Sequence, residues 1–343
     1  MGATLRVGLL GCGAIGRLHL EIWRETAGAS ITAVCDGDFE RARAHALAMG
    51  AEPFADLAEL LSSSLVDAVD ICTPSGQHAQ QGIRCARAGV HVLCEKPLAL
   101  RLDEADALID ACDQAGVTLA SVFQRRALPA LQSVATDLRA GRLGDLLLCS
   151  AHVKWWRDQA YYDSADWRGT WLLDGGVLAN QAIHAIDHLC WLAGPIVAVD
   201  FAAARTALHR MEAEDLAVAV VRFASGAIGT IEATTCSSPP LCTRVEVVGT
   251  RGAVAFDDAR VTAYGADGED LLQGLPPHAA PIGGRSDPMA ISLEGHRAII
   301  GDFVAAVREG RTPLVDGRQA RMAVEAIDRI YRAAGVRTVA AAS

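Results

Sequence analysis

The sequence predicts an α/β protein with two domains, an N-terminal doubly wound parallel sheet followed by an α+β domain with an open, mostly antiparallel sheet. Three observations lead to this prediction. Short apolar runs alternate with amphipathic segments in the first third of the chain, strand-like segments dominate after about residue 125, and a glycine-rich loop follows the first apolar run. We place the domains at residues 1–124 and 125–343. Whether the C-terminal helices pack back on the first domain stays open.

The first domain reads as strands alternating with helices. Its apolar runs are rich in Val, Ile and Leu without a polar alternation, which is typical of strands covered on both faces. Because strands that alternate with helices form right-handed crossovers, the sheet should be parallel. The expected strands are Leu5–Leu10, Ile31–Asp36, Ala68–Thr73, His91–Glu95 and Val117–Phe123, and the expected helices are Phe39–Met49, Gln77–Ala88 and Asp103–Ala115.

The second domain reads as neighbouring strands joined by short turns. Ser225-Gly226 and Thr250-Arg251-Gly252 are turn signals that join adjacent strands, so most of this sheet should be antiparallel. Gly265–Asp287 is rich in Gly, Pro and Asp and predicts a mobile loop. The expected strands are Leu146–Trp156, Ile196–Ala204, Leu216–Phe223, Ala227–Thr234, Arg244–Gly249 and Ala253–Phe256, and the expected helices are Leu178–Leu192, Ala290–Arg308 and Gly317–Arg332.

Composition excludes several classes of protein. The chain has 343 residues, 51% of them hydrophobic, and a net charge of −10, which argues against a disordered chain, a nucleic-acid partner and a polybasic membrane binder. Ten cysteines contain no CxxC pair and no zinc spacing, so we expect reduced thiols and no metal. No apolar stretch is long enough to cross a membrane, and because the first residues show no charged region, apolar stretch and cleavage site in sequence, we expect no leader. We therefore expect a soluble, cytoplasmic protein.

A glycine loop joins the first strand to a helix. Gly11-Cys12-Gly13-Ala14-Ile15-Gly16 fits G-x-G-x-x-G. Gly11 permits the tight turn, Gly13 lets the backbone approach a pyrophosphate, and Gly16 lets the helix pack close to the strand. The pyrophosphate then lies on the free N–H groups of the helix N-terminus. This context predicts a Rossmann domain that binds a dinucleotide.

The acid after the second strand bears on the choice of dinucleotide. Asp36 stands 20 residues after Gly16 and can accept hydrogen bonds from the adenosine ribose, whereas it would repel a 2′-phosphate. The sequence therefore favours NAD over NADP. Arg41 and Arg43, on the next helix, keep NADP open as an alternative.

Two further motifs carry a family resemblance. Glu95-Lys96-Pro97 ends a strand, and residues 174–187 read DGGVLANQAIHAID. Together with the glycine loop and Thr73-Pro74 after the central strand, they make the chain resemble the Gfo/Idh/MocA oxidoreductases, which include glucose–fructose oxidoreductase and inositol 2-dehydrogenase. The resemblance extends over essentially the whole chain. It implies an enzyme that uses NAD or NADP to oxidise or reduce a carbinol of a sugar, cyclitol or related polyol.

Hydride transfer from an alcohol needs a proton acceptor and a donor for the developing alkoxide. Lys96 lies at the carboxyl end of a parallel strand, where ligands bind in doubly wound sheets, and its ammonium is such a donor. By resemblance, the Lys96-Pro97 bond is cis. His184 is the expected proton acceptor because its ordinary pKa lies near working pH. Asp187 either orients His184 or caps a neighbouring segment.

The motif departs from the usual family pattern at two positions. Asn180 stands where the family usually has aspartate, and Ala182 where it usually has glycine. On one continuous helix, Asn180 and His184 would share a face. Because an amide cannot take a proton, Asn180 can only orient substrate, Lys96 or His184, so the catalytic residues expected are Lys96, His184 and Asn180.

The remaining candidates come from the same motifs and from an aromatic segment. Residues 155–171 hold four of the six tryptophans, which suits both stacking on a sugar ring and a loop fixed to the sheet by its aromatics. The expected substrate contacts are Arg157, Tyr161, Arg168, Asn180 and His184. The expected cofactor contacts are Gly11, Gly13, Ala14, Ile15, Gly16, Asp36, Thr73, Pro74, His78, Glu95, Lys96 and Gln124.

Two other functions stay open. Some proteins with this resemblance cleave a glycosidic bond through transient oxidation, without net redox change. A dinucleotide-sensing regulator would be expected to lack the lysine or the histidine, but Lys96 and His184 are both present. The free face of the second sheet predicts a homodimer or homotetramer.

Overall fold

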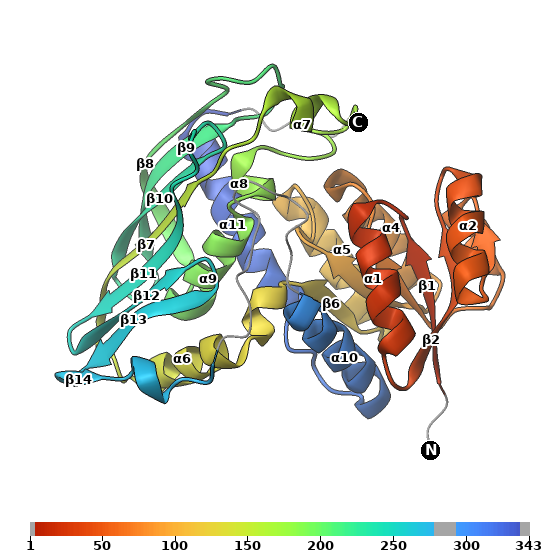
Figure 1. Ribbon diagram of the computed structural model, residues 1–343, viewed down its shortest axis with the longest axis horizontal. Helices are drawn as coiled ribbons and strands as arrows, with labels where there is room; N and C mark the ends of the chain where they lie inside the picture. Colours follow the sequence, from red (N-terminus) through yellow and green to blue (C-terminus); the bar gives the residue numbers. More distant parts are fainter. Residues whose placement is uncertain (1–3, 278–292, 337–343) are drawn as a thin grey trace. The chain divides into compact units, whose positions relative to one another are not determined.

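The computed structural model describes residues 4–277 and 293–336, and the chain forms two compact units (Figure 1). The first unit contains the chain up to Gln124 together with Leu293–Arg321. The second contains Arg125 onward and resumes at Met322. The segment Leu293–Arg321 therefore belongs to the first unit, although it follows the second unit in sequence.

The first unit is built on a six-stranded parallel sheet, which confirms the doubly wound fold. The strand order is β3-β2-β1-β4-β5-β6, so the order reverses between β1 and β4. The three-residue strand β3 and the short helix α3 (Leu57–Ser62) were not expected from the sequence. The strands are β1 (Leu5–Leu10), β2 (Ala29–Cys35), β3 (Glu52–Phe54), β4 (Ala68–Ile71), β5 (His91–Glu95) and β6 (Leu119–Val122).

The helices of this unit begin and end at identifiable residues. Asp38 caps α2 by accepting the N–H of Arg41, and Gly116 ends α5 in the left-handed conformation that favours glycine. Helix α10 packs on α1, β5 and β6. The helices are α1 (Ala14–Glu25), α2 (Phe39–Met49), α4 (His78–Arg87), α5 (Leu102–Ala115), α10 (Leu293–Glu309) and the start of α11 (Gly317–Ala333).

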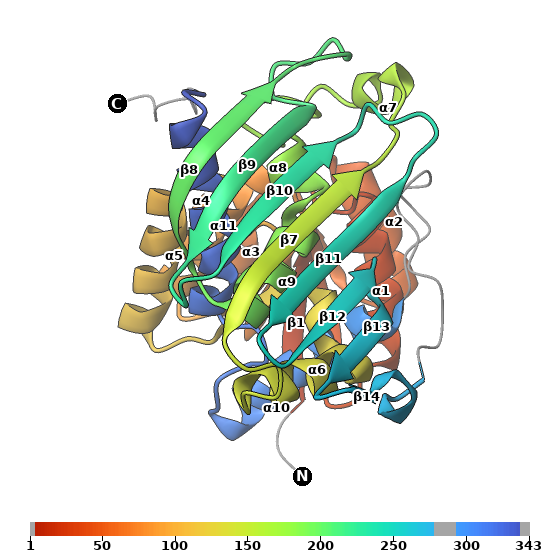
Figure 2. The same cartoon turned by 90° about the vertical axis from the view of Figure 1, so that its left-hand side faces the viewer.

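The second unit is built on an eight-stranded sheet of order β14-β13-β12-β11-β7-β10-β9-β8 (Figure 2). All neighbours are antiparallel except β7 and β10, which are parallel, so the expected mostly antiparallel sheet is confirmed. The strands are β7 (Leu146–Lys154), β8 (Ile196–Arg205), β9 (Leu216–Phe223), β10 (Ile228–Thr234), β11 (Cys242–Gly249), β12 (Gly252–Asp257), β13 (Arg260–Ala266) and β14 (Glu269–Asp270).

The expected loop over Gly265–Asp287 was wrong in its first part. Gly265 lies in strand β13, which pairs with β14. A 3-10 turn follows at Leu272–Gly274. The glycines here serve a tight hairpin rather than a mobile segment. The part of this prediction from residue 278 onward lies outside the described residues.

The single helix expected at Leu178–Leu192 was also wrong. The structure has α8 (Val177–Asn180) and α9 (Ile183–Ala193), separated where the N–H of Ala182 bonds the carbonyl of Val177 five residues back. This irregular turn breaks the helical repeat. Asn180 therefore ends α8 while His184 lies in the first turn of α9, and the two residues do not share a face of one helix.

One face of the second sheet is covered by helices. The almost fully buried α9 packs on β7 and β11, and the unit also contains α6 (Pro129–Arg139), α7 (Gln159–Asp163) and the rest of α11. The strands also carry exposed large apolar side chains, which are Leu147, Leu148, Val197, Phe201, Val218 and Ile228. Such an apolar surface is typical of an interface.

The ten cysteines are all free thiols, as expected, and eight of them are buried. The cytoplasmic location expected from them stays a prediction. Within residues 4–277 and 293–336, no helix combines the length and apolar character needed to span a bilayer.

Candidate active site

The glycine loop between β1 and α1 shows why each glycine is needed. Gly11 has a φ of +96°, and a Cβ there would lie 2.8 Å from the carbonyl carbon of Cys72. A Cβ on Gly16 would overlap the carbonyl oxygen of Gly11. Gly13 differs, because no described atom lies within 4 Å of its Cβ position. Since no side chain caps α1 at Gly13, the open space and the N–H groups of Ala14 and Ile15 fit a bound pyrophosphate.

Asp36 is fixed beside this loop. Its Oδ2 accepts the N–H of Cys12 at 2.7 Å, and its Oδ1 accepts the N–H of Asp38 at 2.9 Å. Arg41 lies 3.7 Å from Asp36 and 3.0 Å from Asp38, whereas Arg43 pairs with a glutamate on its own helix. Both arginines that kept NADP open are therefore engaged with carboxylates.

The loops after β4 and β5 are joined by one histidine. The Nε2 of His78 lies 2.8 Å from the carbonyl oxygen of Thr73, and its Nδ1 lies 2.7 Å from that of Pro97. His78 is buried at the start of α4, and burial lowers its pKa. This contact brings the expected cofactor loop at Thr73-Pro74 next to the loop that carries Lys96.

Lys96 follows the last residue of β5. The Lys96–Pro97 bond is cis, as the resemblance implied, and the N–H of Lys96 donates to Oε2 of Glu95 at 3.0 Å. The Glu95 side chain is almost fully buried. Gln124, the last expected cofactor contact, starts the 3-10 turn after β6. The cofactor candidates of the first unit thus lie at the carboxyl ends of its strands.

In the second unit, the Asp-Gly-Gly motif supports Asn180. Asp174 accepts the N–H of Gly169 at 2.7 Å through Oδ2, and its Oδ1 accepts the side-chain amide of Asn180. Gly175 has a φ of +72°, and a Cβ on Gly176 would overlap the carboxylate of Glu214. The amide at position 180 therefore donates to a buried carboxylate. An aspartate at this position could donate such a hydrogen bond only if it were protonated.

Glu214 is a buried acid that the sequence analysis missed. Its Oε1 accepts the N–H of Leu178 at 3.0 Å and the hydroxyl of Tyr331 at 2.8 Å. Burial raises the pKa of Glu214 to about 7. Glu214 thus fixes the start of α8, the helix that Asn180 ends.

His184 and Asp187 both belong to helix α9. His184 lies in the first turn of α9 and is 9% exposed. Asp187 forms a two-bond ion pair with Arg126, with N–O distances of 2.6 and 2.8 Å. Both oxygens of Asp187 accept from Arg126, so this ion pair joins α9 to the chain at the start of the second unit.

Three expected substrate contacts, Arg157, Tyr161 and Arg168, lie together. The guanidinium carbon of Arg168 lies 4.4 Å from the ring centre of Tyr161, and that of Arg157 lies 5.3 Å from it. Arg168 also donates to the Tyr161 hydroxyl at 2.8 Å, whereas Arg157 is buried and donates to the carbonyl of Trp156. Two guanidinium groups therefore lie within cation–π distance of one aromatic ring.

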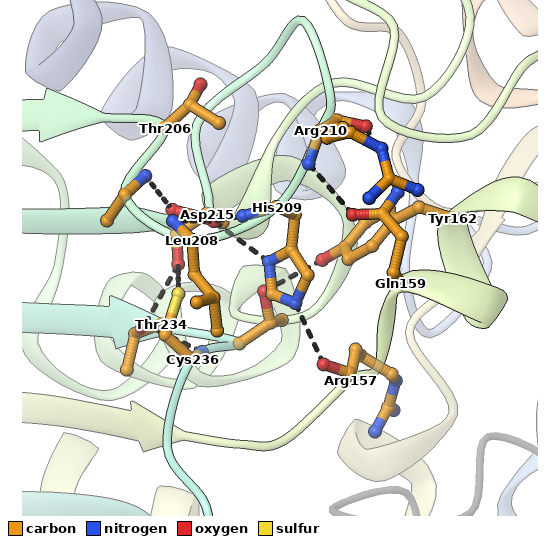
Figure 3. A network of polar contacts seen from close by, with 12 residues as sticks. Arg157, Gln159, Tyr162, Thr206, Leu208, His209, Arg210, Asp215, Thr234 and Cys236 are labelled. Carbon is orange, nitrogen blue, oxygen red and sulfur yellow. Dashed lines mark hydrogen bonds and ion pairs between the residues drawn. The ribbon is translucent and has the colours of Figure 1, made fainter.

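A polar network of Asp215 and His209, which contacts the main chain of Arg157, was not predicted from the sequence (Figure 3). The carboxylate of Asp215 accepts the N–H groups of Ala207, Leu208 and His209 as well as Nδ1 of His209 at 2.8 Å. The Nε2 of His209 lies 2.8 Å from the carbonyl oxygen of Arg157. Burial lowers the pKa of His209, but its hydrogen bonds with Asp215 and the Arg157 carbonyl raise it overall. Protonated His209 thus holds the main chain at Arg157, and no spacing rule would have paired residues six apart in a loop.

Comparison with known protein families matches both units. A model described as the oxidoreductase family with an NAD-binding Rossmann fold matches residues 5–123. A model described as the GFO/IDH/MocA C-terminal domain matches residues 131–255. The matches cover the glycine loop, Lys96, Asn180 and His184.

Individual relatives match along most of the chain. D-apiose dehydrogenase from Paraburkholderia graminis is 30% identical over 95% of this chain and 86% of its own. Myo-inositol 2-dehydrogenase from Thermotoga maritima is 29% identical over 93% of each chain. The WlbA dehydrogenase from Bordetella pertussis, solved in complex with NADH and UDP-GlcNAcA, is 33% identical over 97% of each chain with a TM-score of 0.85.

Proposed function

Because the chain belongs to the Gfo/Idh/MocA oxidoreductase family, we propose that it transfers hydride between NAD and a carbinol of a sugar, cyclitol or related polyol, with Lys96 and His184 acting on the reacting oxygen. The family and its NAD-binding Rossmann domain are established by the matches. The observation that supports the proposal most is the presence of both groups within the matched motifs. The three relatives described above act on or bind a pentose, a cyclitol and a nucleotide-linked sugar acid, so a polyhydroxylated ring is their common chemistry.

The cofactor site fits NAD. Gly11, Gly13 and Gly16 shape a loop with open space beside Gly13, and Asp36 is fixed next to it as an acceptor for a ribose diol. When bound, NAD⁺ would accept the hydride from the carbinol carbon. Asp36 would also repel a 2′-phosphate, which supports the preference for NAD.

Side chains of the protein accept the proton of the substrate hydroxyl and stabilise the negative charge that develops on its oxygen. His184 accepts the hydroxyl proton, because a neutral imidazole is a base near neutral pH. The Lys96 ammonium donates to the oxygen as negative charge develops on it. Asn180 takes no proton, and its amide, held by Asp174, orients the reacting groups. Arg157, Tyr161 and Arg168 bind the rest of the substrate through stacking and hydrogen bonds.

Activity on a panel of polyols, aldoses, uronates and nucleotide sugars, measured by NADH absorbance, tests this proposal. On the substrate found, Lys96→Met and His184→Asn should each lower the rate of hydride transfer by about 100-fold or more, because each removes a positioned group. NAD affinity should stay within about threefold, since the glycine loop and Asp36 are intact; a change of that size is below 1 kcal/mol. Near-normal turnover of Lys96→Met would contradict the assignment, and glycoside cleavage without NADH accumulation would favour the transient-oxidation alternative.

We further propose that the protein assembles through the second sheet into a dimer or a dimer of dimers. The exposed side chains of Leu148, Phe201, Val218 and Ile228 support this, because helices cover only one face of the sheet and exposed apolar side chains on strands favour burial against another subunit. Light scattering of the wild type should give at least twice the 36.1 kDa chain mass, and Phe201→Asp should shift it towards the single chain. A wild-type mass of one chain at micromolar concentration would refute the assembly.

A further inference from the structure

A cluster of buried ionisable side chains lies in the first unit directly behind Lys96. It consists of His19 in α1, Asp70 in β4, Cys72 after β4, Glu95 at the end of β5 and His296 in α10. The side chains of His19 and Asp70 are fully buried, and that of Glu95 is 8% exposed. The reaction proposed above uses none of these side chains for proton or hydride transfer.

His19 lies between two carboxylates. Its Nδ1 is 2.8 Å from Oδ2 of Asp70, which also accepts the indole N–H of Trp23 at 2.7 Å. Its Nε2 is 3.2 Å from Oε1 of Glu95. Because each ring nitrogen lies within ion-pair distance of a carboxylate oxygen, an imidazole protonated on both nitrogens fits this arrangement. Burial lowers the pKa of His19, but Asp70 raises it well above the ordinary value.

Glu95 is held in its ionised form by this arrangement. Burial raises the pKa of Glu95, but His19 at 3.2 Å, together with the charges of His296 and Lys96, lowers it overall. The Nε2 of His296 lies 3.9 Å from the oxygen that faces His19. The other oxygen of Glu95 accepts the main-chain N–H of Lys96. A fixed negative charge therefore sits at the peptide from which the Lys96 side chain starts.

Stability alone does not explain the cluster. Buried ion pairs and triads can often be replaced by apolar side chains with little loss of folding stability. What the charged side chains provide instead is one fixed arrangement of the groups that they join. This cluster ties together the helix after the glycine loop, the strand before Thr73-Pro74 and the strand before Lys96. These are the three segments on which the proposed cofactor and substrate chemistry depends.

We propose that Glu95 is a positioning residue for Lys96, fixing its main chain and favouring its ammonium form, and that protonated His19 holds Glu95 in place from helix α1. Asp70 in turn fixes His19. The groups that face Glu95 are His19, His296 and Lys96, while burial keeps the nearby Cys72 thiol protonated. The inference rests on the proposed function, because it explains how a catalytic Lys96 is prepared.

The lysine content of the chain gives a test that does not depend on activity. Lys96 and Lys154 are the only lysines in the sequence. Lysine labelled with ¹³C at Cε in the full-length protein should therefore give two NMR signals, which Lys154→Arg assigns. Lys154, paired with Glu232 at 2.7 Å in the second unit, is an internal control.

Titration of the two signals compares the wild type with Glu95→Gln and Glu95→Asp. Glu95→Gln should lower the pKa of Lys96 by about one unit or more, because it removes an adjacent opposite charge. Glu95→Asp keeps the charge and should restore most of that shift. The Lys154 signal should not move in either variant. An unchanged Lys96 titration in a folded Glu95→Gln protein would overturn the electrostatic part of the inference.

His19→Gln tests the part played by His19 and serves also if Glu95→Gln does not fold. On the substrate identified above, kcat should fall about 10-fold to 100-fold through misplacement of Lys96, with NAD affinity and KM little changed. His91→Gln, at the other end of β5, is the matched control and should keep wild-type kcat. Unchanged kcat in His19→Gln, or a loss explained by a smaller folded fraction, would overturn the inference. A wild type inactive on every substrate would refute the proposed function, whereas the Lys96 titration would still decide the role of Glu95.

Discussion

Replacing Asn180 by aspartate tests why this chain has an amide where its family usually has an acid. The amide donates to Asp174, a side chain that is 1% exposed and also accepts the N–H of Gly169. Asn180→Asp would set two carboxylates against each other. We therefore expect a variant whose stability and activity both fall as pH rises, and no gain in turnover on simple polyols.

The size of the effect follows from the charges. Two like charges about 4 Å apart repel by about 4 kcal/mol at an effective dielectric constant of about 20. Since one pKa unit corresponds to about 1.4 kcal/mol, this would raise one carboxyl pKa by up to about 3 units. Position 180 is partly exposed, so we expect about half of this effect, which corresponds to a folded-state pKa of about 5.5.

The sign of the pH dependence is fixed by this shift. A carboxyl whose folded-state pKa lies above its unfolded value of about 4 causes no penalty below that value. The penalty grows as pH rises through the folded-state value, to about 2 kcal/mol at pH 8. For a unit of about 200 residues, this should lower Tm by about 4 to 8 °C.

Thermal unfolding at pH 5 and pH 8 measures the effect against wild type. The double variant Asp174→Asn with Asn180→Asp is the control, because its new amide can accept from Gly169 and donate to the new carboxylate. It should recover most of the stability at pH 8. Equal pH dependence of Tm in wild type and Asn180→Asp would refute the pairing, and a many-fold gain in activity on simple polyols would refute the orienting role of Asn180.

Two further predictions concern the cofactor and the substrate segment. NAD should bind more tightly than NADP, and Asp36→Ala should narrow that difference; wild-type binding of NADP that is tenfold tighter, about 1.4 kcal/mol, would contradict the role of Asp36. His209→Gln should raise KM more than it lowers kcat, because protonated His209 holds the Arg157 main chain. The folded-state pKa of His209 is raised, so protonated His209 stabilises the fold fully below about pH 6.5, and this stabilisation is lost as pH rises through the folded-state pKa. The Tm of His209→Gln should therefore depend less on pH above about 6.5 than the Tm of the wild type. A KM unchanged from wild type would count against the role of His209.

The sequence was most informative where one local rule decides the structure. Strand β1 and helix α2 have the bounds that the sequence analysis predicted, because an uninterrupted apolar run and a helical repeat ended by glycine leave little choice. The break between α8 and α9 was missed because Gln181 and Ala182 carry no helix-breaking signal. It is stabilised instead by contacts from distant residues, such as Glu214 at the start of α8.

Buried polar groups were the least predictable part of the candidate site. His19, Asp70 and Glu95 are separated by 51 and 25 positions, so only the folded sheet brings them together. Each alone resembles an ordinary residue of a helix or strand. The motif residues themselves were found because the spacing of the glycines and the Lys-Pro step can be recognised in the sequence. The buried polar side chains that hold these residues in place form no such pattern.

The division of the chain has a consequence for how the protein is made. Strand β6 bonds the chain at Val315, and α10 supplies His296, so the nucleotide-binding unit lacks a helix until synthesis has passed through residues 125–292 of the second unit. A nascent chain released at residue 124 would leave the α1 surface that α10 covers open to water. Vectorial folding therefore cannot finish the first unit first. We expect the N-terminal fragment to depend on chaperones or to aggregate, so the segment Leu293–Arg321 decides when the first unit can be completed.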